Sequence, residues 1–325
     1  IRIGKTPGVG LAIAVVMALR GNVKCFWTKL PCLVGGLLVG GAVSYATSKV
    51  TSALKSAMNG SPNPVHSATG AKILGGDEEL DFTLQGLLPI DWQRFYSSLD
   101  TRRDGLFGAG WSVAYEVSIE IEADENLVYI DEQGRRLEIG YIPLSGGAFD
   151  PGQGLAVRRS GDGAVLIESI DGLYRLFEPD PLNNSRMRLH LLGDRNEGRI
   201  FLDYDSQGRL YRLRDTHDLM HVELNYSAEH PRRVSYIERR YLRQDHFDAR
   251  SDVLVSYRYD SVGDLAEVLD EQGTTLRRFA YDNDRRMVEH QLPSGLRCFY
   301  QWAEVPGPGG PEWRVSRHWT DARDE

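Results

Sequence analysis

The sequence predicts a mainly β protein, a spiral of paired β-hairpins preceded by an α-helical hairpin of transmembrane character. Three observations lead to this expectation. Residues 1–76 contain eight Lys and Arg and no Asp or Glu, whereas the remainder holds 30 basic and 46 acidic residues, a net charge of −16. From about Val65, short runs of alternating apolar and polar residues appear, which is typical of strands. In the second half, a Tyr-Asp pattern recurs at similar spacing.

The first 60 residues contain two uncharged apolar runs, Thr6–Leu19 and Leu30–Thr47, separated by a basic and aromatic segment. As helices these runs are about 21 and 27 Å long, against a hydrocarbon core of about 30 Å. Gly36 and Gly40 form a small-xxx-small pair that allows close helix packing. We therefore expect residues 1–60 to be a basic, membrane-active helical hairpin. A helical hairpin buried in a soluble core and a signal peptide are the alternatives.

A short Pro-containing linker marks the predicted domain boundary, and it consists of Ser61, Pro62, Asn63 and Pro64. Proline cannot continue a helix, so residues 61–75 are expected to form the linker and the start of the β-rich part. An exposed linker of this kind is also a candidate cleavage region, whether the cut is intramolecular or made by a host protease. We divide the remainder into a first β region, 76–200, and a repeat region, 201–325.

Several segments of the β-rich part have distinct predictions. Val113–Ile121 and Val253–Tyr259 alternate like strands, and Ile237–Asp252, rich in Arg and Asp, is predicted to be a surface loop. The glycines of Gly105–Gly110 are spaced like a phosphate-binding loop, but no strand-helix-strand unit surrounds them. We expect this segment to be a turn that places Trp111 in the core.

The repeat is a strand that ends in Tyr-Asp and continues into a turn. Tyr259 and Tyr281 lie 22 residues apart. The Tyr ring should pack on the sheet, the Asp should accept from backbone N–H groups of the turn, and Gly at the fourth position should take a left-handed conformation. A single hairpin cannot bury its own face, so neighbouring units must pair. The expected repeat residues are Tyr204, Asp205, Gly208, Tyr259, Asp260, Gly263, Tyr281 and Asp282.

These units resemble the YD repeats of Rhs proteins. Three further motifs, in order, resemble the opening of the Rhs shell: P-V-x-x-x-T-G at 64–70, L-P-x-x-x-x-R-x-Y-x-S at 88–98 and G-x-G-W-S at 108–112. The resemblance covers about residues 62–302. It implies a hollow β-cocoon that encloses a C-terminal toxin, which would lie beyond Glu325.

The resemblance is to the N-terminal part of a type VI secretion Rhs effector, and it implies delivery and encapsulation without catalytic residues in this chain. The implied partners are an Eag-type chaperone on residues 1–60, the VgrG spike, the protein's own toxin inside the shell and the inner membrane of the target cell. The protein would be made in the cytoplasm, shielded by the chaperone and then secreted, and its head would insert into the recipient membrane. Two features of such effectors are missing from the sequence, a PAAR spike-tip domain and a C-terminal core-and-cleavage motif.

Two other functions remain open. One is a membrane-anchored Rhs-like surface or toxin-complex protein, and the other is a β-rich hydrolase, for which the sequence shows no carboxylate pair. His217 and His221 could share a zinc ion only on a helix, and this segment is predicted to be strand and turn, so we expect no metal site and no cofactor. The acidic body would repel phosphates, so we expect no nucleic-acid partner.

Overall fold

The structure is a computed structural model that describes residues 65, 69–217, 220–243, 246–307 and 310–321. Within these ranges the protein consists of strands β1–β22 and one short 3-10 turn, η3 (Asp77–Glu79), which confirms the prediction of a mainly β fold. No helix of the described ranges has the length and apolar character needed to cross a membrane. The predicted helical hairpin of residues 1–60 lies outside the described residues, as do Gly36, Gly40 and the linker 61–64.

A small sheet forms from the first four strands: β1 (Ile73–Leu74), β2 (Leu80–Leu84), β3 (Ile90–Ser97) and β4 (Trp111–Val113). Strand β3 is central and pairs antiparallel with the other three. Its aromatic and charged residues are almost all buried, because the small sheet is covered by the rest of the molecule.

The large sheet contains all the later strands. From β8 to β22, consecutive strands pair antiparallel, so this part of the sheet is a series of β-hairpins. The bounds are β5 (Ser118–Ile121), β6 (Asn126–Ile130), β7 (Arg136–Tyr141), β8 (Gly147–Asp150), β9 (Leu155–Arg159), β10 (Val165–Ser169), β11 (Tyr174–Asp180), β12 (Asn183–Gly193), β13 (Arg199–Tyr204), β14 (Leu210–Asp215), β15 (Met220–Tyr226), β16 (Val234–Arg243), β17 (His246–Tyr259), β18 (Leu265–Leu269), β19 (Thr275–Tyr281), β20 (Met287–Gln291), β21 (Arg297–Gly307) and β22 (Gly310–Thr320).

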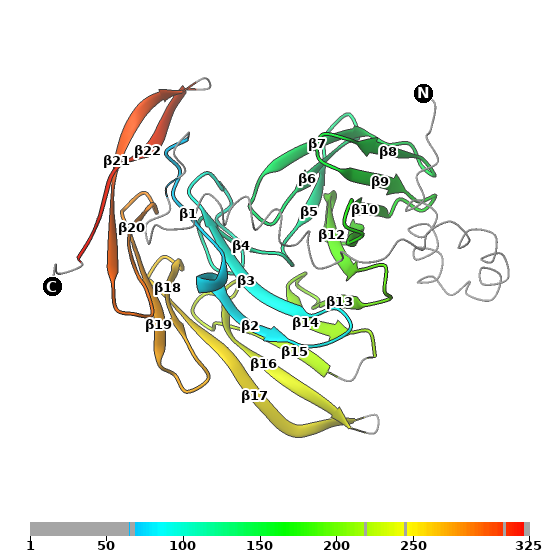
Figure 1. Ribbon diagram of the computed structural model, residues 1–325. Coiled ribbons are helices and arrows are strands. Elements are labelled where there is room, and N and C mark those ends of the chain that lie inside the picture. Colours follow the sequence, from blue (N-terminus) through cyan, green and yellow to red (C-terminus); the bar gives the residue numbers. More distant parts are fainter. Residues whose placement is uncertain (1–64, 66–68, 218–219, 244–245, 308–309, 322–325) are drawn as a thin grey trace.

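The large sheet forks at β12. Arg186–Arg188 pair with β5, which continues into β6 and β7, whereas Leu191–Gly193 pair with β13. Figure 1 shows the sheet curling around the small sheet, with β5–β10 to one side and β13–β22 to the other. The predicted boundary between residues 200 and 201 falls inside β13 and stays a prediction.

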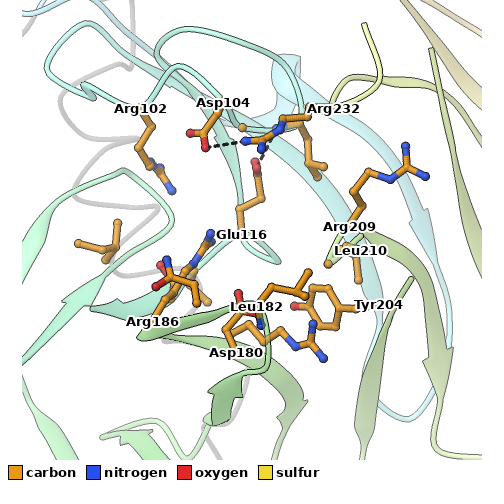
Figure 2. A pocket seen from close by; sticks show the side chains of 18 of the residues that line it. Arg102, Asp104, Glu116, Asp180, Leu182, Arg186, Tyr204, Arg209, Leu210 and Arg232 are labelled. Carbon is orange, nitrogen blue, oxygen red and sulfur yellow. Dashed lines mark hydrogen bonds and ion pairs between the residues drawn. The ribbon is translucent and has the colours of Figure 1, made fainter. Parts of the chain in front are cut away.

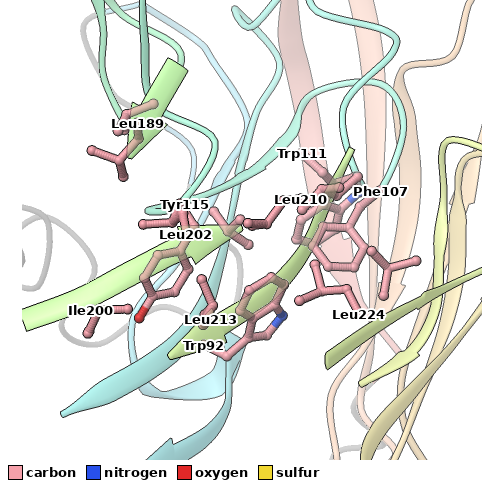
Figure 3. Close-up of a cluster of buried hydrophobic side chains, with 14 of the residues drawn as sticks. Trp92, Phe107, Trp111, Tyr115, Leu189, Ile200, Leu202, Leu210, Leu213 and Leu224 are labelled. Carbon is pink, nitrogen blue, oxygen red and sulfur yellow. The ribbon is translucent and has the colours of Figure 1, made fainter. Parts of the chain in front are cut away.

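The main hydrophobic core lies between the two sheets. Trp92 and Trp111 of the small sheet and Phe107 of the loop between β3 and β4 are all at most 1% exposed. They pack against side chains of the large sheet such as Leu210 and Leu213, as Figure 3 shows. A buried aromatic side chain removes roughly 150–250 Å² from water, so these three residues contribute strongly to holding the sheets together.

Two predictions of local structure are wrong. Ile237–Asp252 is not a surface loop, because β16 and β17 extend through it as one long hairpin. The many Arg residues lie on strands there, and the Arg239 guanidinium lies 4.3 Å from the centre of the Tyr241 ring. Val113–Ile121 is not one strand either, because Val113 ends β4 in the small sheet and Ser118 begins β5 in the large one. The chain passes between sheets at that point.

Candidate functional site

The aspartates of the repeat bind the turn that follows them, as predicted. In each, the Oδ1 atom accepts hydrogen bonds from the backbone N–H groups two and four residues later, at 2.7–3.0 Å. The predicted aspartates Asp205, Asp260 and Asp282 share this geometry with Asp131, Asp194 and Asp270, which the repeat search did not include. Six turns therefore use one local mechanism.

The fourth residue of each predicted unit takes the left-handed conformation. Gly208 has φ 77° and Gly263 has φ 84°, as expected for glycine. In the third unit Arg285 occupies this position with φ 66°. A residue with a side chain is strained there, and the Arg285 Nε atom donates to the Asp264 carboxylate at 2.6 Å. This ion pair, formed with a fully buried carboxylate, holds the strained residue in place.

The tyrosines of the repeat tie one hairpin to another. Their hydroxyl groups donate to main-chain carbonyl oxygens of earlier segments: Tyr204 to Leu189, Tyr226 to Leu210, Tyr259 to Val234 and Tyr281 to Leu265, at 2.6–2.9 Å. Burial raises the pKa of each of these phenols above its ordinary value. The hydroxyls therefore remain protonated donors at neutral pH, and the contacts are structural.

A buried ionic network joins the small sheet to the large one. Arg94 of β3, fully buried, donates to both carboxylate oxygens of Asp81 at 2.8 and 2.9 Å and lies 2.9 Å from Glu79. Glu79 in turn contacts Arg277 of β19 at 2.5 Å. Tyr257 of β17 donates to Asp81 at 2.6 Å. Burial raises the pKa of Glu79, and the adjacent guanidinium groups of Arg277 and Arg94 oppose that shift.

Aromatic hydrogen bonds reinforce the same junction. Trp92 Nε1 donates to the Tyr257 hydroxyl at 3.0 Å, and Trp111 Nε1 donates to the Tyr281 hydroxyl at 2.7 Å. Tyr281 is thus both a repeat residue and an anchor for the small sheet. We call the buried contacts between residues 69–113 and the strands β16–β20 the plug–sheet junction, and residues 69–113 the plug.

The glycine-rich loop of the plug is a packing element, as predicted. Gly108 has φ 92°, and a Cβ atom there would lie 2.7 Å from the carbonyl oxygen of Gly263. The next residue, Ala109, donates its N–H to Asp264 at 2.7 Å. Trp111 follows and is 1% exposed. The loop needs glycine because it lies directly on a repeat turn.

Arg233 fastens the loop from the other side. Its guanidinium donates to three carbonyl oxygens, those of Arg103, Gly105 and Gly263, at 2.6–2.8 Å. Main-chain hydrogen bonds also cross the junction, from Leu265 N–H to the Phe107 carbonyl at 3.1 Å and from Val234 N–H to the Leu106 carbonyl at 3.2 Å. The junction is therefore held by side-chain and main-chain hydrogen bonds together.

Comparison with known proteins agrees with these motifs. An RHS Repeat model matches residues 259–297, and a domain of unknown function, DUF6531, matches residues 62–139. Double-stranded DNA deaminase toxin A of Burkholderia cenocepacia is 30% identical over 288 residues, covering 86% of this chain and 19% of that protein. The chain belongs to the Rhs/YD-repeat family.

A second curated protein and a solved structure are also similar to this chain. Toxin protein Tse5 of Pseudomonas aeruginosa is 29% identical over 287 residues, covering 76% of this chain and 21% of that protein. The solved Tc holotoxin pore of Photorhabdus luminescens has a TM-score of 0.43 and 11% identity, covering 78% of this chain and 19% of that one. This Rhs-family chain thus spans about a fifth of the length of the curated relatives it matches.

The sequence did not point to most of the junction residues. Arg94 occurs in the motif that resembles the Rhs shell opening, but nothing local indicates that it binds Glu79 and Asp81. A departure from the repeat could have pointed to Asp264. The other two units carry an arginine at the same position, Arg209 and Arg286, and each binds the Asp of its own turn.

Two histidines, His217 and His221, were considered as zinc ligands and set aside. His221 lies on β15 and is buried, and His217 precedes that strand. Among the residues that the structure describes, no group of three or more His, Cys, Asp or Glu side chains is placed to hold a metal ion.

Proposed function

We propose that this chain is the non-catalytic front of the shell of a secreted Rhs toxin. Its large sheet would begin the wall that encloses a downstream toxin, and the plug would close the wall at that end. The observation that carries the proposal is the plug–sheet junction, in which a separate small sheet is fixed inside the curve of a growing hairpin sheet by fully buried ion pairs. The relatives named as toxins, of which the chain spans about a fifth, support a role in toxin delivery.

Protease protection tests the enclosure. In the longer protein that carries the downstream toxin, the toxin should resist a protease that digests it when it is expressed alone. The variant Arg94→Met should weaken the plug and make the toxin sensitive to the protease. The control variant Arg258→Met, at a solvent-exposed position, should leave the toxin resistant. Rapid digestion of the toxin in the unmodified protein would contradict the enclosure.

We also propose the finer assignment, an antibacterial effector of the type VI system whose residues 1–60 assist membrane translocation. Support comes from the composition of that segment, which contains two uncharged apolar runs, seven Lys and Arg and no Asp or Glu. In this proposal an Eag-type chaperone covers residues 1–60, the VgrG spike carries the protein, and cleavage occurs at 61–64. Co-purification with the chaperone, lost on deletion of residues 1–60, is the expected result. If the intact protein is soluble and does not bind the chaperone, this assignment is contradicted.

A further inference from the structure

The fork at β12 produces both a cavity and a free sheet edge. The cavity is lined by arginine and carboxylate side chains together. Figure 2 shows two of them in contact, Arg232 and Asp104, which lie 3.2 Å apart. The edge belongs to β8, at the far end of the limb that runs from β12 through β11, β10 and β9. The charges of the cavity are matched inside the chain, so the edge is the feature that remains open to a partner.

Strand β8 has an edge without a neighbouring strand. It pairs with β9 and with no other strand of the described ranges, and all four of its residues are exposed. The Arg159 N–H donates to the Gly146 carbonyl at 3.0 Å, next to the pair Gly147–Arg158. Hydrogen-bonded and non-hydrogen-bonded pairs alternate along an antiparallel ladder, so the N–H and C=O groups of Gly147 and Phe149 point away from β9. The open edge presents a donor and an acceptor from each of these two residues.

The other two ends of the forked sheet are protected. Strand β7 carries Arg136 and Glu138, and its pairing with β6 contains a bulge. On β22 the Val315 N–H donates to the Gly70 carbonyl at 2.9 Å, so the plug covers part of that edge. Charges, bulges and covering segments all hinder pairing with another chain. The single charged residue of β8 is Asp150, whose carboxylate is bound by N–H groups of its own loop.

Exposed apolar side chains lie on and next to this edge. Phe149 is on β8 itself, Leu144 is in the turn before it and Tyr141 ends β7, and each of the three is more than half exposed. Apolar side chains beside an unpaired strand favour association with another chain.

A second copy of this chain fits the edge, because β8 is complementary to itself. When two β8 strands pair antiparallel about a twofold axis at Ala148, Gly147 of each copy lies opposite Phe149 of the other. Their open N–H and C=O groups then form two hydrogen bonds in each of two equivalent pairs. An axis at Phe149 would instead place Gly147 opposite Pro151, which has no N–H to donate.

The side chains agree with the axis at Ala148. Gly147 lies opposite Arg158 of β9, and a Cβ atom on this glycine would be 3.3 Å from the Arg158 Cγ atom. The stem of Arg158 therefore lies over the glycine. Phe149 is two residues further along the strand and shares this face. The partner's Phe149 would fill the space over Gly147 and place its ring beside the Arg158 side chain, as a cation–π contact requires.

We propose that β8 is a homodimerisation edge, at which two copies of this chain pair antiparallel through Gly147 and Phe149. The interface is short, because the turn at residues 143–146 and Pro151 bound the strand. A small interface of this kind gives a concentration-dependent equilibrium between monomer and dimer. The role goes beyond the shell function and does not depend on it.

Cysteine crosslinking tests the register in the full 325-residue chain, with Cys25 and Cys32 changed to Ser in every variant. At the axis the two Ala148 residues form a non-hydrogen-bonded pair, whose Cα atoms are about 4.5 Å apart, within the range for a disulfide. Ala148→Cys should form covalent dimers under mild oxidation at least about tenfold faster than Val262→Cys, because pairing raises the effective thiol concentration. Val262 is an exposed residue of the β17–β18 turn and reports random collision. Phe149→Cys should crosslink as slowly as this control.

Sedimentation velocity measures the same contact without a disulfide. Phe149→Lys should raise the Kd of the dimer at least about tenfold, because each dimer loses two ring contacts with Arg158 and gains two like charges near the axis. Val262→Lys makes the same substitution at an exposed apolar position outside the edge and should leave the Kd unchanged.

Four results would overturn the proposal. The first is an unmodified chain that is still monomeric at about 0.5 mM, and the second is an unchanged Kd for Phe149→Lys. The third is rapid crosslinking of Phe149→Cys without crosslinking of Ala148→Cys. The fourth is a longer protein that stays monomeric and in which Ala148→Cys does not crosslink, because a later segment of the polypeptide would then cover β8.

Discussion

The repeat turns and the plug–sheet junction are stabilised in opposite ways. In the turns, an aspartate binds backbone N–H groups two and four residues away, and the same arrangement recurs six times. In the junction, partners lie far apart in sequence, for example 155 residues for Ala109 and Asp264 and 191 for Met287 and Tyr96. A repeated local contact can be lost at one place with small effect, whereas a unique long-range contact cannot.

The largest effect is expected for Arg94→Met, which leaves the Asp81 carboxylate buried without its cation and Glu79 with Arg277 as its one remaining cation among the described residues. Removing one partner of a buried ion pair costs about 3–5 kcal/mol. The loss of free energy of unfolding is measured by urea denaturation, followed by tryptophan fluorescence. The control Arg258→Met breaks the pair with Glu267, in which the arginine side chain is 67% exposed, and should change the free energy of unfolding by less than about 1 kcal/mol. Similar losses in both variants would remove the contrast between the two regions.

Alanine substitutions at two glycines distinguish the cost of backbone strain from the cost of a steric clash. Gly108 and Gly273 both have positive φ, 92° and 81°, but only Gly108 lies against a neighbour, the Gly263 carbonyl. Gly273→Ala should cost about 1–2 kcal/mol, the strain of a left-handed alanine. Gly108→Ala adds the steric clash and should cost at least about 3 kcal/mol in the same unfolding assay. Equal costs would show that the plug loop does not rest on the repeat turn.

Tyr281→Phe tests the residue shared by both regions. The change removes the acceptor of Trp111 Nε1 and the donor to the Leu265 carbonyl, and we expect a loss of about 1–3 kcal/mol. Tyr211→Phe is the matched control, because the Tyr211 ring packs beneath Arg212 and its hydroxyl binds no described residue. Thermal unfolding of the two variants measures the difference. A Tyr281 variant as stable as the Tyr211 variant would argue against the shared anchor.

The smallest effect concerns a single turn and depends on pH. Burial acts to raise the pKa of Asp205, but the backbone N–H and side chain of Arg209 outweigh it, so the pKa lies below its ordinary value. The charged form therefore stabilises the fold above the unfolded-state pKa, about 3.9, and this contribution disappears as the pH falls through the lower folded-state value. Asp205→Asn keeps the turn acceptor and should lose about 0.2–1 kcal/mol at pH 7, and almost nothing at pH 2. Urea unfolding of both proteins at pH 7 and pH 2 measures this difference. A loss of stability that is the same at both pH values would contradict the ion-pair explanation.

The sequence predicts the turns well because their interactions are local. Tyr, Asp and Gly at fixed spacing indicate the hairpin and its turn, and Asp205, Asp260 and Gly263 lie as expected. Departures from the pattern carry information too: Arg285 in a left-handed position and Asp264 in place of an arginine are bound to each other.

The junction could not be predicted from local sequence. The partnership of Arg277 with Glu79 depends on how far the large sheet curls, which no short motif encodes. The hairpin of β16 and β17 was missed for a different reason. Its charged residues suggested a loop, although they lie on paired strands, where the Arg239 guanidinium packs on the Tyr241 ring.

Hydrogen exchange across the junction tests the central claim that the plug is fixed on the large sheet. The amides of Val234 and Leu265 bond to the plug carbonyls of Leu106 and Phe107. In the full chain, peptides that cover these two amides should exchange slowly, and Arg94→Met should accelerate them more than the peptide covering Leu166, which lies within the β10–β11 pair and in a separate core cluster. If Arg94→Met leaves exchange at Val234 and Leu265 unchanged, the large sheet does not depend on the plug, and the account is wrong.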